Sequence, residues 1–558
     1  MILRGVERRW ELKPVDDALV GEITSGLGVS ELLARVLVAR GSGSVSDAGD
    51  FLAAGDAPLA DARLLPDAGL VVARVARALE TGEQIAVHGH DDADGVCATI
   101  IMVEALEQLG ANPLHYVPDR RREGHGLSRG EIDGLASSSV GLVITVDSCV
   151  SDRELIAYAS ELGIDTIVTD HHEIPPTLPD AVAVVNPKLP DSPFPYRYMA
   201  GVGVSLRVAE LLLDELSGRF RGRSVRPWSG SRWGDEAFAL AAIGSISDKV
   251  PLTGENRKIV ARGLVATART ERPGLRAMLS ESGLWGRELE PSDVRESLGP
   301  IFGRVSDGRG GNEALTALIS ADEDEARTVA RRLAEGRGLW RESANAAWRK
   351  ASRDLDLAAL KEAGNVVVIE ADVPIEVLGY VTNRLADEMG RPAIVIAPKG
   401  DEVMGEARGP YGFNLVEAFS TMPELFLGYG GHPRAAGFSA KPDVTRDFKS
   451  RMKEYARANP PAPPPRVVDA EFDLARLTPA AATDLERLRP FGFGNGRAVL
   501  LARSVTSETV ESARSNRIHL GTPSRFGRTP CDVVYRVRPA DEIALVHVLE
   551  TVQEESGG

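Results

Sequence analysis

Short apolar runs alternate with helical patterns over residues 85–185, and this alternation limits the fold more than any other feature of the chain. The runs Ile85–Val87, Leu142–Val146, Thr166–Val168 and Val182–Val185 have the length and composition of buried strands. Segments with apolar residues at helical spacing, such as Val96–Leu109, lie between them. Strands joined through helices are parallel, so this region is expected to be a doubly wound α/β sheet.

Acidic and histidine residues follow these strands at the point where each one ends. The set is His90, Asp92, Asp94, Asp147, Asp170, His171 and His172, with Asp248 after a later helical stretch. In open α/β sheets, functional sites form beyond the carboxyl ends of the strands. Any one of these residues could be a buried hydrogen-bonded side chain, but crowded carboxylates repel one another unless cations neutralise them. A pair of divalent cations held in this way is a common solution for hydrolysing phosphodiesters, which is the chemistry that the pattern predicts.

The rest of the chain divides at changes in composition. Residues 1–80 are expected to form a helical cap on the sheet, 81–320 the domain with the site, and 321–365 a long connecting helix. Residues 366–458 have a second α/β pattern, and a proline-rich linker follows from 459 to 465. Short β-rich runs at 498–510, 532–537 and 543–549 predict a small β-barrel, an OB-fold, within residues 467–558.

Composition limits the cellular compartment and the classes of partner expected for the chain. Three scattered cysteines do not make a disulfide framework, and the N-terminus lacks an apolar signal core, so we expect a cytoplasmic protein. No apolar run has the length needed to cross a membrane, and we expect no membrane partner. A net charge of −16 argues against a generally basic surface, although a local basic channel can still bind nucleic acid.

The ordered motifs resemble a known family. Asp170-His171-His172 after an apolar strand, with the turn 90–95 upstream, resembles the DHH phosphoesterase superfamily. Within it the chain is similar, over nearly its whole length, to the RecJ-like exonucleases specific for single strands. Further segments that carry the likeness are 116–120, 146–147, 161–165, 244–252, 390–393, 412–415, 430–437 and 490–495.

This resemblance implies a role for each matching residue. It implies two Mn²⁺ or Mg²⁺ ions, with Asp170 expected to bridge them, held by His90, Asp92, Asp94, Asp147, Asp170, His171 and Asp248. It implies a catalytic set of Asp170, His171, His172 and His432, in which His172 positions the attacking water. It implies substrate contacts at Arg120, Arg408, Gly430, Gly431 and His432.

One departure from the family pattern concerns the substrate pocket. Glu406 stands where the family has serine, two residues before Arg408, the match to an arginine that holds the 5′-terminal phosphate. Glu406 could turn toward Arg408 and pair with it, or the enzyme could accept 5′-hydroxyl ends nearly as well as phosphorylated ends.

The predicted function is metal-dependent 5′–3′ hydrolysis of single-stranded DNA to mononucleotides in DNA repair or recombination. The expected partners are single-stranded nucleic acid, with DNA favoured over RNA, and replication or repair proteins. One alternative is a DHH phosphodiesterase acting on oligoribonucleotides or cyclic dinucleotides, which such a long chain with an OB-like region disfavours. The other is a replication-fork scaffold, which the retained carboxylates disfavour.

Overall fold

The computed structural model describes residues 2–5, 9–118, 126–220, 232–302, 312–353, 365–410, 412–461, 465–520, 529–540 and 543–554. The chain forms two compact units. One unit comprises Lys13–Arg337 and Val468–Thr551, and the other comprises Met1–Leu12, Gly338–Val467 and Val552–Gly558. Each unit has hydrophobic cores of its own.

A five-stranded parallel sheet lies at the centre of the part of the first unit that carries the site. Its strands, in spatial order, are β4 (Leu114–Tyr116), β3 (Gln84–His88), β5 (Val140–Val146), β6 (Asp165–Thr169) and β7 (Ala183–Val185). The sheet therefore grows in both directions from β3, and the order reverses between β3 and β5. This confirms the doubly wound sheet predicted from the alternation.

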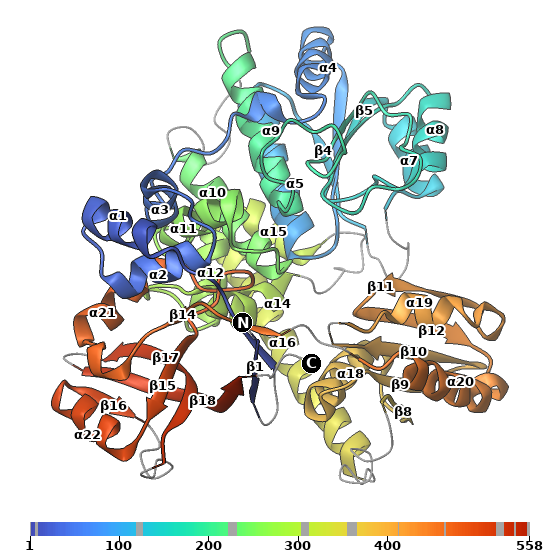
Figure 1. Cartoon of the computed structure of the whole chain (residues 1–558). Helices are drawn as coiled ribbons and strands as arrows, with labels where there is room; N and C mark the ends of the chain where they lie inside the picture. The colour runs from blue at the N-terminus through green and yellow to red at the C-terminus, as the bar shows by residue number, and fades with distance from the viewer. Residues whose placement is uncertain are drawn as a thin grey trace. The chain divides into compact units, whose positions relative to one another are not determined.

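Helices cover both faces of this sheet (Figure 1). One face packs against α4 (Ala68–Thr81), α5 (Ala93–Gln108) and α9 (Gly201–Leu216), and the other packs against α7 (Arg129–Ser137) and α8 (Arg153–Glu161). The apolar helix α10 (Trp233–Ser247) packs against α5, α9 and α11 (Gly254–Thr267). The same hydrophobic core also contains residues of α12 (Pro273–Glu281), η2 (Val294–Leu298), α14 (Gly299–Phe302) and α15 (Glu313–Ile319). The short helix α13 (Pro291–Asp293) directly precedes η2.

The N-terminal helices pack differently from the expected cap. The structure has α1 (Asp17–Leu27), α2 (Glu31–Ala39) and α3 (Val45–Leu52) in one hydrophobic core with residues 470–546, and α4 is the helix that packs on the parallel sheet. In Figure 1 these helices lie beside the C-terminal sheet, although the two are far apart in the sequence. Amphipathic spacing shows that a helix buries one face, but it does not say which partner covers that face.

The C-terminal part of the first unit is a sheet region, consistent with an OB-like domain. It contains β14 (Ala470–Glu471), β15 (Leu500–Val505), β16 (Ile518–Leu520), β17 (Cys531–Ala540) and β18 (Ile543–Glu554), with α21 (Pro479–Asp484), η5 (Leu474–Arg476), η6 (Leu485–Leu488) and α22 (Ser507–Ser515). β15 pairs antiparallel with β17, and β16 pairs parallel with β18. The β-rich run expected to reach residue 510 ends at Val505, because Thr506 caps α22.

Helix α16 (Glu323–Arg353) joins the two units and confirms the predicted connecting helix. Its first half contributes Val329 and Leu333 to the core around the parallel sheet. Its second half contributes Ala344 and Trp348 to a core of the second unit. The predicted extension of the helix through residue 364 lies outside the described residues.

The second unit is built on a mixed sheet between two helical layers. The strand order is β11 (Gly428–His432), β12 (Ala435–Ala440), β10 (Glu402–Arg408), β9 (Ala393–Lys399) and β8 (Val367–Glu370). Helix α18 (Ile375–Met389) packs on one face, and α19 (Leu415–Ser420) and α20 (Thr445–Ala458) pack on the other. Short elements η3 (Pro423–Leu425), η4 (Pro442–Val444) and β13 (Arg466–Val468) complete it, with a hairpin of β1 (Ile2–Gly5) and β2 (Arg9–Leu12).

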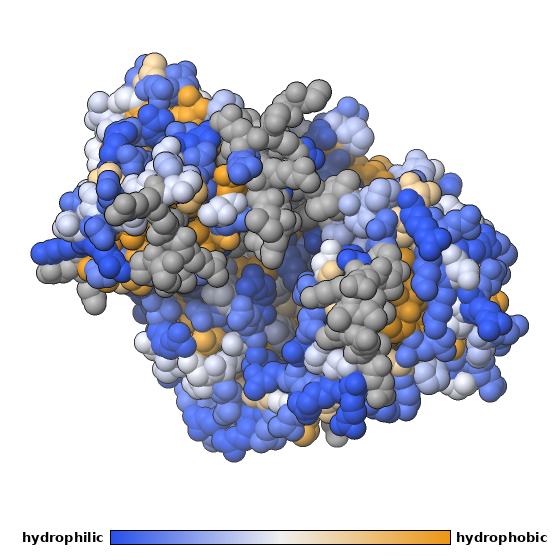
Figure 2. Space-filling view, turned by 60° about the horizontal axis from the view of Figure 1, so that its bottom comes forward, coloured by the Kyte–Doolittle hydropathy of each residue, from blue (hydrophilic) through white to orange (hydrophobic). Residues whose placement is uncertain are grey.

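Hydrophilic residues predominate on the face shown in Figure 2, and hydrophobic residues form separate patches there. Among the described parts of the chain, none of the helices is both long enough and apolar enough to span a membrane.

Candidate metal centre

The site lies at the carboxyl ends of β3, β5 and β6. His90 follows β3, Asp147 follows β5 and Asp170 follows β6. Backbone bonds continue the sheet past the strand ends: the N–H of Asp147 donates to the carbonyl of Thr169, and the N–H of Asp170 donates to that of Val185. The ligand-bearing turns therefore lie side by side at the switch point of the sheet.

The turn after β3 directs two carboxylates by different means. Asp92 caps α5, and its Oδ1 accepts hydrogen bonds from the N–H groups of Asp94 and Gly95. Asp94 lies in the first turn of α5, where its two oxygens accept from the N–H groups of Gly201 and Val202 at 2.8 and 2.9 Å. These N–H groups begin helix α9, so the positive end of that helix stabilises the buried carboxylate.

His171 lies at the centre of the cluster. Its Nε2 is 3.1 Å from Oδ1 of Asp147, 3.8 Å from Oδ2 of Asp94 and 3.7 Å from Oδ2 of Asp248. Asp248 reaches this position as the residue that ends α10. On the other side, His90 Nδ1 lies 3.1 Å from Oδ2 of Asp92 and 3.9 Å from Oδ2 of Asp147.

Three overlapping groups of these side chains have ligand atoms close enough to hold a metal ion. Within each group the ligand atoms lie within 4.8 Å of one another, and the groups are His90–Asp92–Asp147, Asp147–His171–His172 and Asp94–His171–Asp248. Asp147 belongs to two of them. Its Oδ1 is buried and, among the described residues, accepts no hydrogen bond. A mixed set of carboxylate oxygens and imidazole nitrogens with such an atom at its centre fits divalent cations of the Mn²⁺ and Mg²⁺ type.

Asp170 has a different place from the bridging one that we expected. It is fully buried, and its Oδ2 accepts from the N–H of Val150. Its Oδ1 accepts from the N–H groups of His171 and His172, and Nδ1 of His172 lies 2.7 Å from the same oxygen. Among the described residues it belongs to none of the three groups. Asp147 is thus common to two of the groups, whereas both oxygens of Asp170 accept hydrogen bonds from backbone N–H groups.

Crowding shifts the acidities of this centre. Burial, followed by the charge of Asp248, raises the pKa of Asp94 to about 7. Burial and the charges of Asp94 and Asp92 raise the pKa of Asp147 well above its usual range. Burial, followed by the charge of Asp92, raises the pKa of Asp248 to about 6. Protons therefore replace some of the positive charge when no cation is bound.

The two carboxylates that pair with histidines have lowered pKa values. Burial acts to raise the pKa of Asp92, but the hydrogen bond and charge of His90 outweigh it and lower the pKa to about 2. Burial also acts to raise the pKa of Asp170, and its bond to His172 outweighs this and lowers it. The same bond raises the pKa of His172, whereas burial lowers the pKa of His171. Of the two neighbouring histidines, His172 therefore carries a proton more readily than His171.

Sequence reasoning missed the small residues that make room for the centre. A Cβ at Gly201 would lie 2.3 Å from Oδ1 of Asp147, and one at Gly95 would lie 2.4 Å from Cβ of His90. A Cβ at Gly244 would lie 2.8 Å from Oδ1 of Asp94. The available signal was the run Gly201-Val202-Gly203 directly before a helical pattern, which is typical of a helix N-terminus that binds an anion.

The predicted substrate residues fall in the second unit or outside the described residues. Nη1 of Arg408 lies 2.6 Å from Oε2 of Glu406, so these two side chains pair. Gly430 and Gly431 lie in β11, and Gly431 has a φ of +130° and a backbone too close to Ala435 for a side chain. His432 ends β11, but its side chain is not among the described parts. Arg120 lies outside the described residues.

Comparisons with known proteins identify the family. The profile of the DHH family, N-terminal domain, matches residues 84–224, and that of the DHHA1 domain matches residues 363–458. The chain is 32% identical over 531 residues to the single-stranded-DNA-specific exonuclease RecJ of Bacillus subtilis, covering 94% of this chain and 65% of the relative. It is 31% identical over 419 residues to RecJ of Dickeya dadantii, covering 71% of this chain and 70% of the relative. The chain belongs to the RecJ family.

A solved RecJ supports the same fold. The crystal structure of RecJ in complex with Mn²⁺ from Thermus thermophilus matches with a TM-score of 0.77 and 24% identity, covering 98% of this chain and 80% of that one. The chain spans about two thirds of the length of the curated RecJ relatives it matches. A divalent metal cofactor fits both the RecJ family and the cluster of ligand atoms found here.

Proposed function

We propose that this protein is a metal-dependent exonuclease that hydrolyses single-stranded DNA from the 5′ end to mononucleotides, in DNA repair or recombination. The observation that carries this proposal is the pair of metal-capable groups that share Asp147 in a chain of the RecJ family. The relatives are named as exonucleases specific for single-stranded DNA, which supports the substrate.

The ligand side chains form two sets that Asp147 connects. His90 and Asp92 group with Asp147, Asp94 and Asp248 group with His171, and Asp147 also groups with His171 and His172. Two divalent ions, when bound, would lower the pKa of a water and neutralise charge on the scissile phosphate. The backbone bonds to Asp92 and Asp94 fix both carboxylates before any ion arrives. This preorganisation reduces the cost of assembling the site.

His172 and Asp170 supply the proton handling. Nδ1 of His172 lies 2.7 Å from Oδ1 of Asp170, so a proton on Nδ1 is donated to that oxygen. His172 is about half exposed on its side chain (47%), so it can contact a water or a phosphate oxygen. We assign to His172 the positioning of the attacking water, with Asp170 fixing the ring.

The second unit supplies contacts to the end of the strand. Arg408 lies in β10, in cross-strand register with Ala435, which is in register with His432 of β11. Its pairing with Glu406 leaves less of the positive charge for a terminal phosphate. We therefore assign Arg408, Gly430, Gly431, His432 and Arg120 to the substrate, with a reduced preference for 5′-phosphate ends.

The OB-like region supports a single-stranded ligand, since such folds bind single strands through base stacking and backbone electrostatics. Replication and repair proteins are the partners that this role implies, and the cytoplasm is the compartment in which it is carried out.

A degradation assay on end-modified strands tests the proposal. Single-stranded DNA, the matching duplex and single-stranded RNA are incubated with Mn²⁺ or Mg²⁺, each with either the 5′ or the 3′ terminus blocked. We expect mononucleotides from single-stranded DNA, loss of activity when the 5′ terminus is blocked, and little activity on the duplex. Degradation that persists with a blocked 5′ end, or that favours RNA, would contradict the assigned polarity or substrate.

A further inference from the structure

The segment Pro490–Gly496, called here the C-terminal turn, contacts the residues that follow the ligand Asp248. The N–H of Leu252 donates to the carbonyl of Phe493 at 2.7 Å. Phe493 stands at the tip of the turn with half of its surface exposed (51%), whereas Leu252 is buried. A backbone carbonyl of the C-terminal region therefore accepts a hydrogen bond from Leu252, which lies four residues after the candidate ligand Asp248.

Two glycines let the C-terminal turn approach this closely. A Cβ on Gly492 would lie 2.5 Å from Cδ1 of Leu252. A Cβ on Gly494 would lie 2.8 Å from Cβ of Pro251, and Gly494 has a φ of +73°, which side chains disfavour. At Gly496, none of the described residues lies within 4 Å of the corresponding position. The close contact therefore involves the first two glycines and not the third.

The C-terminal turn is itself held rigidly. Asn495 is buried, its Nδ2 donates to the carbonyls of Leu488 and Pro490, and its Oδ1 accepts from Arg40. The buried guanidinium of Arg257, on α11, donates to the carbonyls of Leu488 and Arg489.

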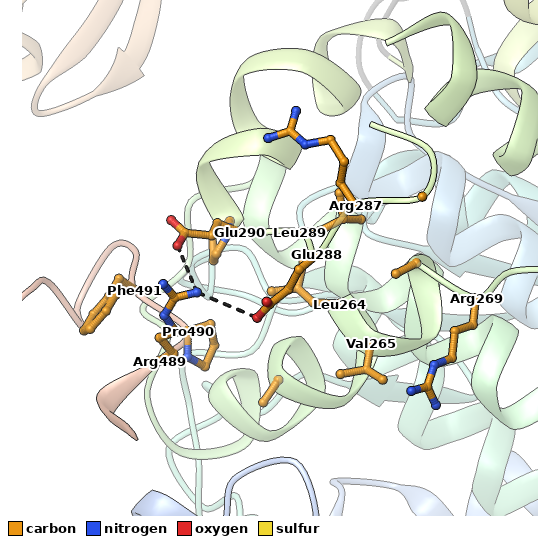
Figure 3. A pocket seen from close by; sticks show the side chains of 14 residues that line it. Leu264, Val265, Arg269, Arg287, Glu288, Leu289, Glu290, Arg489, Pro490 and Phe491 are labelled. Carbon is orange, nitrogen blue, oxygen red and sulfur yellow. Dashed lines mark ion pairs between the residues drawn. The ribbon is translucent and has the colours of Figure 1, made fainter. Parts of the chain in front are cut away.

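An ion pair holds the start of the turn from outside. Arg489 points toward Glu290 and Glu288, with N–O distances of 3.0 and 3.8 Å (Figure 3). These residues line a hollow of about 560 Å³ together with Pro490 and Phe491. The C-terminal turn therefore has contacts on several sides, and these hold the backbone that packs against Pro251 and Leu252.

From the C-terminal turn the contacts lead to a second ligand. The carbonyl of Pro251 accepts from Nδ2 of Asn256, and the same nitrogen donates to the carbonyl of Tyr198 at 2.6 Å. Asn256 is completely buried. Tyr198 lies three residues before Gly201, whose N–H holds the carboxylate of Asp94. The segments that place Asp248 and Asp94 are thus bonded to each other through one side chain.

We propose that the C-terminal turn is a positioning element for the Asp94–His171–Asp248 group, linking the OB-like region to one of the two ligand sets. The turn touches no ligand, and it acts by fixing the backbone of residues 250–252 and, through Asn256, the start of α9. The His90–Asp92–Asp147 group lies in the turn after β3 and at the end of β5. None of the hydrogen bonds described above ends on it, and of its members only Asp147 lies against Gly201. The inference concerns metal binding, so it does not depend on the substrate proposed above.

Gly494→Ala in the full-length protein tests this, with Mn²⁺ binding followed by the electron paramagnetic resonance signal of free Mn²⁺. Asp248→Asn first identifies which class of Mn²⁺ belongs to the group containing Asp248. We expect Gly494→Ala to weaken that class by roughly tenfold or more, as outer-shell changes commonly do, and to leave the other class unchanged. Gly496→Ala is the matched control in the same turn and is expected to leave both classes unchanged.

Two results would overturn the proposal. One is unchanged affinity in both classes, and the other is equal weakening of both classes, which would indicate a general loss of structure. Circular dichroism and the thermal midpoint establish that the variants are folded. If Gly494→Ala does not fold, Gly492→Ala takes its place, because its close neighbour is the end of a flexible leucine side chain. The same two results then decide.

Discussion

Lowering the pH should weaken Mn²⁺ binding by displacing the metal with protons. The pKa of Asp94 is raised to about 7 by burial and by the charge of Asp248. An acid with a raised pKa keeps its proton below that value, so the cation must displace the proton at pH 6 but not at pH 8. At pH 6 this competition costs about 1.4 kcal/mol from Asp94 alone, which is roughly a tenfold loss of affinity. The raised pKa values of Asp147 and Asp248 act in the same direction.

Isothermal titration of the metal-free protein at both pH values measures this effect. Repeating the titration at pH 6 in buffers with different ionisation enthalpies gives the number of protons released. We expect about one to two protons per protein at pH 6 and fewer at pH 8. Equal dissociation constants at the two pH values, with no proton release at pH 6, would show that the carboxylates are already ionised in the metal-free protein and would refute this account of the centre.

Three substitutions test other parts of the account. Asp170→Ala leaves three backbone N–H groups without their acceptor and removes the carboxylate that contacts the imidazole of His172. The value of kcat should therefore fall by roughly 100-fold or more. Near-normal turnover in a folded variant would contradict the role given to Asp170. Gly201→Ala forces a methyl group against Asp147 and should weaken Mn²⁺ binding in a titration. Gly218→Ala, whose added Cβ meets none of the described residues within 4 Å, should not. Glu406→Ser frees its arginine partner and should raise the ratio of kcat/KM on 5′-phosphate to that on 5′-hydroxyl strands; an unchanged ratio would place this carboxylate outside the pocket.

The candidate ligands of the centre could be found from the sequence because they follow the ends of parallel strands. Continuous apolar runs mark the parallel strands, because both faces of such a sheet are buried. The residues that follow these strands must meet at one edge of the sheet. His90, Asp147 and Asp170 were located in this way, and the structure places all three turns side by side. Asp248 has no such strand before it, and its place in the cluster depends on how α10 packs against α5 and α9.

The errors arose where a local pattern has more than one tertiary solution. The first three helices pack with the C-terminal core, because an amphipathic stripe does not specify its partner. Helix starts are a second example. Ser151-Asp152-Arg153-Glu154 has the pattern of a capping box, but Asp152 is the residue before α8 and makes no side-chain cap among the described residues. Ser320–Glu323 has the same pattern, but α16 begins at Glu323 and the side chain of Asp322 accepts from the N–H groups of Asp324 and Glu325.

The roles within the DHH motif also needed three dimensions. Asp170 and Asp147 both follow strands, and the pattern alone cannot tell which one is shared between ligand sets. Hydrogen bonds from backbone N–H groups occupy both oxygens of Asp170, whereas Asp147 Oδ1 is buried with no such bond among the described residues. The contribution of Asn256 was likewise invisible, because it joins two carbonyls that are 53 residues apart in the chain, those of Tyr198 and Pro251.

The central claim is that this chain cuts single-stranded DNA by means of the metal centre that Asp147 holds together. The most direct test follows release of mononucleotides from internally labelled single-stranded DNA by the wild-type protein and by Asp147→Asn, each stripped with chelator and then supplied with Mn²⁺. We expect the wild type to be inactive after stripping and to recover on adding Mn²⁺, and we expect the folded variant to stay inactive. Nucleotide release by the stripped wild type, or full recovery of Asp147→Asn with Mn²⁺, would contradict the claim.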